Sequence, residues 1–118
     1  MIDEATKASL RAALVEQHQN LRAEIVAQGG DADSEDAVVD VERGFADSAH
    51  STAERARLLS VMKALRANLR WVDRALTKMD LGTYGVCERC GTPIPLERLE
   101  ALPWAILCID CAHLGEGR

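Results

Sequence analysis

Aromatic side chains are scarce in this chain of 118 residues. One phenylalanine, one tyrosine and two tryptophans make up only 3% of the sequence. Aromatic residues bury more area than most other side chains, so their scarcity argues against a large conventional globular core. The apolar content comes mainly from alanine and leucine, which favour helices. The sequence therefore predicts long helices.

Long apolar runs are also absent. The longest uninterrupted apolar stretches are a few residues long, whereas a membrane-spanning helix needs about 20 such residues. A secretory signal likewise needs an apolar run of about 7 to 15 residues. We therefore expect no membrane partner, no secretory leader and a cytoplasmic location.

Basic residues are outnumbered by acidic ones. The chain has 14 Lys and Arg against 19 Asp and Glu, which gives a formal net charge of −5 and a pI near 5.1. Tight binding of nucleic acid by a protein alone usually requires a concentrated basic surface, so direct DNA binding is not expected. No nucleophile–base pair and no phosphate-binding loop is recognisable, so the sequence does not predict an enzyme.

Cysteine is confined to two Cys-x-x-Cys pairs near the C-terminal end. Cys87 and Cys90 form the first pair, Cys108 and Cys111 form the second, and 17 residues separate the two pairs. This spacing is typical of a zinc site with four thiolate ligands. Four thiolates fill the tetrahedral shell and leave no position for water, so we expect one structural Zn²⁺ ion rather than a catalytic one.

Other interpretations of the cysteines remain open. Two disulfides are disfavoured in a reducing compartment. A thioredoxin-like redox pair would need a βαβ context, which is not apparent. His113 lies two residues after Cys111 and is a competing ligand, although an exposed helical position is expected for it. A thiol redox sensor is a further alternative function.

Two long helices are predicted before the cysteines. Residues 3–28 contain no Pro or Gly, and an apolar stripe runs along them at Leu10, Leu14, Leu21 and Ile25. Gly29 and Gly30 end this helix, and a polar loop and a short helical piece over about 35–43 follow. The second helix runs from about Asp47 or Ser51 to about Leu81. Its apolar residues recur alternately every four and three residues, at Leu58, Met62, Leu65, Leu69, Val72, Leu76 and Met79.

The two apolar stripes predict a mainly α fold, a long antiparallel helical hairpin (coiled coil) with a small C-terminal four-cysteine zinc-finger module. If the chain reverses near Phe45, an antiparallel hairpin sets Ile25 beside Leu65, Leu21 beside Leu69, and Leu14 beside Leu76. A homodimeric coiled coil through the second helix is the alternative. The predicted domains are the hairpin over 1–81 with an acidic tip near 31–50, the zinc-finger module over 82–114, and a tail over 115–118.

Charge is segregated along the chain. Residues 31–54 contain eight carboxylates and one arginine, whereas residues 55–78 contain seven basic residues and one aspartate. Arg66, Arg70, Arg74 and Lys78 recur every four residues, so we expect this basic series to lie along one outer face of the helix. A candidate partner-binding basic face therefore comprises Lys63, Arg66, Arg70 and Arg74. A merely solvated helix face is the alternative.

The cysteine region carries a longer motif, C-E-R-C-x3-I-x3-R-x4-P-x4-C-x2-C. It is met by Cys87, Glu88, Cys90, Ile94, Arg98, Pro103, Cys108 and Cys111. This pattern resembles the signature of the DksA/TraR zinc-finger proteins. The resemblance covers about residues 44–114, while the first helix matches in character only.

The resemblance implies a function. Members of this family bind bacterial RNA polymerase, their coiled-coil hairpin enters the secondary channel, and its tip approaches the catalytic centre without binding of DNA. The family's tip motif, Asp-x-x-Asp-x-Ala, matches at Asp47 and Ala49, while Gly44 replaces its first Asp. Asp47 is therefore the candidate polymerase-facing residue, and a helix N-cap is its alternative role.

The resemblance also bears on guanosine tetraphosphate, which the family binds through basic residues. The matching positions here are Ala64, Trp71 and Ala112, which cannot pair with phosphates. Weak or no binding through the usual site is expected, although Lys63, Arg70 or Arg74 could rebuild a site. The sequence thus predicts a transcription regulator that binds RNA polymerase; the alternative is a zinc-ribbon coiled-coil adaptor that binds another protein or self-associates.

Overall fold

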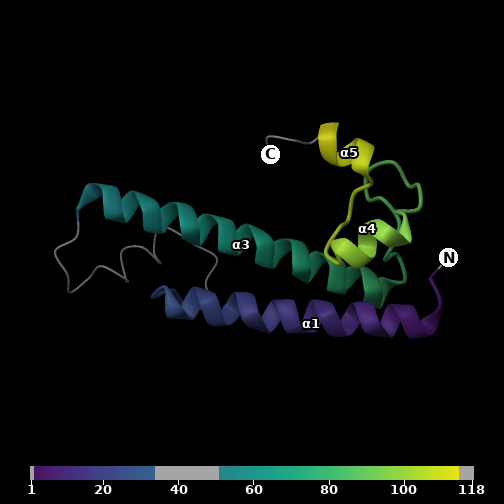
Figure 1. Ribbon diagram of the computed structural model, residues 1–118, viewed down its shortest axis with the longest axis horizontal. Coiled ribbons are helices and arrows are strands. Elements are labelled where there is room, and N and C mark those ends of the chain that lie inside the picture. Colours follow the sequence, from purple (N-terminus) through teal and green to yellow (C-terminus); the bar gives the residue numbers. More distant parts are fainter. Residues whose placement is uncertain (1, 34–50, 115–118) are drawn as a thin grey trace. The chain divides into compact units, whose positions relative to one another are not determined.

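The computed structural model describes residues 2–33 and 51–114. Within these residues the structure is mainly helical, and Figure 1 labels the helices. They are α1 (Glu4–Ala27), α3 (Thr52–Leu81), α4 (Leu96–Ala101) and α5 (Ile109–Leu114). The long helices α1 and α3 form the antiparallel hairpin, and the four cysteines cluster in the C-terminal module, so the predicted fold class is confirmed. The short helical piece predicted over 35–43, the reversal near Phe45 and the tail lie outside the described residues.

Both long helices end in the same way, at a glycine in the left-handed region. After α1, Gly29 has φ 95°, and its N–H and that of Gly30 donate to the carbonyls of Val26 and Ile25. After α3, Gly82 has φ 79°, and the N–H of Thr83 donates to the Lys78 carbonyl at 2.9 Å. These hydrogen bonds form Schellman motifs, which satisfy the last carbonyls of each helix.

Side-chain caps define where the helices begin. The Asp3 carboxylate accepts a hydrogen bond from the Thr6 N–H at 2.7 Å. Hydrogen bonds from the side chain and the backbone of Thr6 lower the pKa of Asp3. At α3 the Ser51 hydroxyl accepts from the Glu54 N–H, while the Glu54 carboxylate accepts from the Ser51 N–H, both at 3.1 Å. This reciprocal pair is a capping box. The cap role considered for Asp47 therefore belongs to Ser51.

The chain divides into two compact units, one comprising Met1–Gln17 and Trp71–Arg118 and the other His18–Arg70. Each unit buries part of the apolar stripe predicted for the first helix. The buried stripe residues of α1 are Leu10, Leu14, Leu21 and Ile25, as predicted. The buried residues of the α3 repeat are Met62, Leu69, Val72 and Met79. The other repeat positions, Leu58, Leu65 and Leu76, are half-buried.

Within the unit that contains the cysteines, an ion pair joins α1 to α3 and reports the register of the two helices. Arg11 of α1 donates to the Asp80 carboxylate of α3 at 2.7 Å. The predicted register sets Leu14 beside Leu76. Arg11 lies three residues before Leu14, and Asp80 lies four residues after Leu76. The ion pair therefore fits an antiparallel pairing within one residue of the predicted register.

None of the helices in residues 2–33 and 51–114 combines the length and the apolar character that a membrane crossing requires.

Candidate metal centre

The first cysteine pair lies on a tight turn. The Cys87 N–H donates to the Thr92 carbonyl at 2.8 Å, and the Gly91 N–H donates to the Cys87 carbonyl at 2.9 Å. Gly91 has φ 79°, a conformation that residues with a Cβ rarely adopt. A single antiparallel bridge between Val86 and Pro93 closes the turn. The turn directs two sulfurs to one side of the backbone.

The second pair begins at the start of α5. The Ala112 N–H donates to the Cys108 carbonyl at 2.9 Å, and the Cys111 N–H points to the Cys108 Sγ at 3.5 Å. The first pair shows the matching contact, from the Cys90 N–H to the Cys87 Sγ at 3.5 Å. In each pair, therefore, the first sulfur lies beside a backbone N–H donor.

The four sulfurs form one compact cluster. All four Sγ atoms lie within 4.8 Å of one another, and those of Cys90 and Cys108 are 3.7 Å apart. Tetrahedral zinc with Zn–S bonds of about 2.3 Å requires S···S distances of about 3.8 Å. A disulfide would require about 2.05 Å, and all four cysteines are free thiols. The donor set and its spacing fit a four-coordinate structural zinc ion.

The cluster is electrostatically prepared for a cation. Burial alone would raise the pKa of the Cys87 thiol, but hydrogen bonds from the backbone N–H groups of Cys108, Cys90 and Arg89 lower it to about 5. Burial and the neighbouring sulfurs raise the pKa of the Cys111 thiol to about 12. Hydrogen bonds with the side chain and backbone of Thr92 lower the pKa of the Cys90 thiol. The cluster thus favours the thiolate at two positions, Cys87 and Cys90, and resists further negative charge. A divalent cation removes that repulsion and stabilises all four thiolates.

A small apolar core supports the cluster. Its buried side chains are Ile94, Leu99, Ile106 and Leu107. Trp104 is half-buried. The Tyr84 hydroxyl donates to the Pro103 carbonyl at 2.8 Å, and the Arg98 Nε donates to the Leu107 carbonyl at 3.1 Å. No spacing pattern indicates these two contacts, because each one joins a side chain to a distant backbone carbonyl.

Glu88, within the first cysteine pair, connects the metal centre to α3. Its carboxylate accepts from the Arg74 Nε at 2.7 Å and lies 4.0 Å from the Lys78 Nζ. This contact raises the pKa of the Arg74 guanidinium. The Glu88 N–H also donates to the Ile106 carbonyl at 2.8 Å. One residue of the motif therefore contacts α3 and the segment that leads to the second cysteine pair.

The predicted basic face requires correction. Arg66 is 3% exposed and Lys78 is 8% exposed, so the expectation that the basic series lies on one outer face is wrong for these two residues. Arg74 is exposed but paired with Glu88. Lys63 and Arg70 are exposed. A partner-binding surface on this helix would therefore centre on Lys63 and Arg70.

The other candidate residues fall in two classes. Asp47 and Ala49 lie outside the described residues. His113 is exposed on α5, and the metal-ligating group found in the described residues consists of the four cysteines without it.

Comparisons with known proteins agree with this geometry. The sequence profile of the prokaryotic dksA/traR C4-type zinc finger matches residues 82–114. Among solved structures, the transcription factor DksA2 from Pseudomonas aeruginosa is 30% identical, with a TM-score of 0.70. That similarity covers 97% of this chain and 85% of the other. The chain belongs to the DksA/TraR family.

Curated proteins similar to this DksA/TraR chain align over shorter stretches. The RNA polymerase-binding transcription factor DksA of Caulobacter vibrioides is 38% identical over 74 residues, which are 63% of this chain and 52% of the relative. An uncharacterized protein of Aquifex aeolicus is 55% identical over 47 residues, which are 40% of this chain and 32% of the relative. The chain thus spans between a third and a half of the length of these relatives. Its family contains RNA polymerase-binding transcription factors. The C4-type zinc-finger match and the four clustered cysteines identify a site for one structural zinc ion in this chain.

Proposed function

We propose that this chain is a bacterial transcription regulator that binds RNA polymerase. The hairpin of residues 1–81 enters the secondary channel, and the segment that carries Asp47 and Ala49 approaches the catalytic centre. The zinc-finger module of residues 82–114 anchors α3 through the contacts of Glu88 with Arg74 and Lys78. The protein acts in the cytoplasm, and it is neither an enzyme nor a DNA-binding protein.

The similarity to DksA2 carries this proposal, because it includes both the helical hairpin and the zinc-finger module. The electrostatics support it as well. A net charge of −5 disfavours direct contact with DNA and leaves a protein surface as the more suitable partner. The exposed cations Lys63 and Arg70 of α3 would contact acidic groups of that surface.

Asp47 is the residue we propose to act on the polymerase. It matches the second aspartate of the family's tip motif and lies in the acidic stretch of residues 31–54. A carboxylate near a catalytic centre interacts strongly with metal ions and basic groups, because the electrostatic interaction is less screened in a narrow, partly dehydrated channel. Ala49 would provide a small side chain where the tip passes closely.

The test combines binding and activity. Wild-type protein, Asp47→Asn and Asp36→Asn are compared in co-purification with core RNA polymerase and in multi-round transcription. Asp36→Asn is the matched control, because it removes the same charge from the same acidic segment. We expect all three to bind and only Asp47→Asn to lose regulation. If both variants still regulate transcription, the tip mechanism is contradicted. If the wild-type protein does not bind polymerase, the whole proposal is contradicted. A dimer in light scattering without polymerase binding would support the adaptor alternative.

We further propose that guanosine tetraphosphate does not act through the family's usual site. Ala64, Trp71 and Ala112 occupy the matching positions and offer no cation. Arg74, a neighbour that could replace them, already pairs with Glu88. A titration of the complex with polymerase checks this. Tight nucleotide binding that depends on this protein would contradict it.

A further inference from the structure

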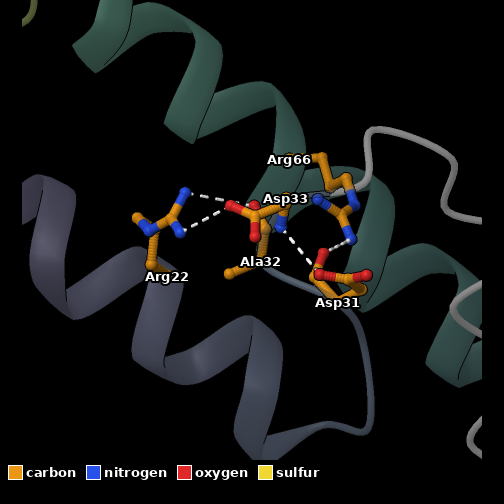
Figure 2. A network of polar contacts seen from close by, with 5 residues as sticks. All are labelled: Arg22, Asp31, Ala32, Asp33 and Arg66. Atoms are coloured by element: carbon orange, nitrogen blue, oxygen red, sulfur yellow. Dashed lines mark hydrogen bonds and ion pairs between the residues drawn. The ribbon is translucent and has the colours of Figure 1, made fainter.

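Two arginines from different helices hold residues 31–33, at the start of the acidic segment. Arg22 of α1 donates through Nη1 to the Ala32 carbonyl at 3.2 Å and through Nη2 to the Asp33 carboxylate at 2.9 Å. Arg66 of α3 donates through Nη2 to the Asp31 carbonyl at 2.7 Å. Figure 2 shows the two guanidinium groups approaching this short segment from opposite sides. Residues 31–33 are therefore held by both helices.

The burial of Arg66 makes it the stronger of the two contacts. Its side chain is 3% exposed, and a buried guanidinium is costly unless its donors are satisfied. It donates to a backbone carbonyl 35 residues earlier in the sequence. A carbonyl is part of the main chain, so this hydrogen bond determines the path of the backbone rather than only compensating a charge.

Arg22 makes the weaker, more exposed contact. The side chains of Arg22 and Asp33 are 38% and 85% exposed, and exposed ion pairs contribute little and are screened by salt. Its second hydrogen bond, to the Ala32 carbonyl, is part-buried. Arg22 therefore reinforces a position that Arg66 determines.

The segment itself is shaped to receive these contacts. The Asp33 N–H donates to the Asp31 carboxylate at 2.9 Å, which forms an Asx turn. The Schellman motif at Gly29 and Gly30 sets the direction in which the chain leaves α1. The backbone path from the end of α1 to Asp33 is thus defined by local turns and by both arginines.

We propose that Arg22 and Arg66 form a clamp that positions residues 31–33, and that the regulation of polymerase requires this clamp. The part of this proposal that links the clamp to regulation rests on the function proposed above. The clamp holds the backbone at residues 31–33, and the Ser51 capping box defines where α3 begins. Asp47 lies between these two anchors in the sequence. Arg66 is in this view a positioning residue and not part of a partner-binding face.

Hydrogen exchange tests the clamp independently of polymerase. Arg66→Met removes the donors but keeps a long apolar side chain, and Arg70→Met makes the same change at an exposed arginine of the same helix. We expect amide exchange over residues 29–33 to rise about tenfold or more in Arg66→Met, because a hydrogen bond from a charged group is lost. Arg70→Met should leave it unchanged. Equal exchange in the two variants would overturn the clamp.

A second variant keeps the test decisive if Arg66→Met does not fold. Arg22→Gln changes a side chain that is 38% exposed, so the fold should tolerate it. It should raise exchange over the same residues by a smaller factor, and peptides around the cysteines serve as the internal reference. Unchanged exchange in Arg22→Gln would remove Arg22 from the clamp.

Transcription then tests the positioning role. A purely structural role would raise the protein concentration needed for half-maximal regulation, whereas loss of positioning lowers the maximal effect at saturation. We expect Arg66→Met to lower this maximal effect and Arg66→Lys to restore part of it, because lysine can still donate to the Asp31 carbonyl. An unchanged maximum with raised exchange would contradict the positioning role. If wild type itself fails to regulate, the proposed function fails, while the exchange result still decides whether the clamp exists.

Discussion

Single residues determine how the zinc-finger module responds to pH, and Tyr84 is the clearest case. Its hydroxyl donates to the Pro103 carbonyl, and burial raises its pKa to about 12. The free side chain titrates near about 10. Because the folded state favours neutral Tyr84, the stability from this group is fully present below about pH 10 and is lost as the pH rises towards 12.

This shift is directly measurable. Tyr84 is the one tyrosine of the chain, so the tyrosinate absorbance reports on this residue alone. We expect a midpoint near 12 in native protein and near about 10 in urea. Tyr84→Phe should abolish the absorbance change and weaken the alkaline loss of stability. A native midpoint equal to that in urea would show that the hydroxyl is not held as described.

At the scale of elements, the capping box of α3 gives a prediction with an internal control. Ser51→Ala removes the acceptor of the Glu54 N–H and should lower the free energy of unfolding by about 1 kcal/mol. Ser60→Ala makes the same chemical change at an exposed position inside α3, where alanine is the better helix former, and should not destabilise. Urea unfolding measures both. A similar loss in both variants would mean that the cap contributes nothing specific.

The helix end at Gly82 gives a second test at this scale. A Cβ at this position would meet no atom within 4 Å, so the cost of a substitution comes from the positive φ alone. Gly82→Ala should therefore lower the free energy of unfolding by about 1 kcal/mol, and Gly82→Asn by less, because asparagine tolerates this conformation. Equal effects of the two substitutions in urea unfolding would contradict this explanation.

The elements also show what the sequence can and cannot reveal. The stripe from Leu10 to Ile25 is predictable because periodic apolar residues report which helix face is buried. The same periodicity places Arg66 outside the core. Arg66 donates to a backbone carbonyl 35 residues away, and no local sequence pattern predicts that residues 31–33 lie beside this arginine. The four cysteines were recognisable because metal ligation demands a particular residue type at a particular spacing.

At the scale of the whole molecule, zinc removal should affect the two units unequally. The metal ligands belong to one unit, and binding energy at a structural zinc site is folding energy. A strong chelator should unfold the module, change the fluorescence of Trp104 and abolish polymerase binding. Most helical circular dichroism should persist, because α1 and α3 have 24 and 30 residues while α4 and α5 have 6 each. Unchanged fluorescence and binding after verified metal loss would refute a structural role for zinc.

The sulfurs of the metal cluster differ in their access to solvent. Cys87 and Cys111 are buried, whereas Cys90 is exposed and Cys108 is intermediate, so each Cys-x-x-Cys pair supplies one inner and one outer ligand. A bound zinc ion would therefore be expected to exchange from one side, through Cys90 and Cys108. A competing chelator or a metal donor meets the outer sulfurs first, while the inner sulfurs stay shielded. The outer pair of sulfurs, Cys90 and Cys108, would then set the lifetime of a bound ion.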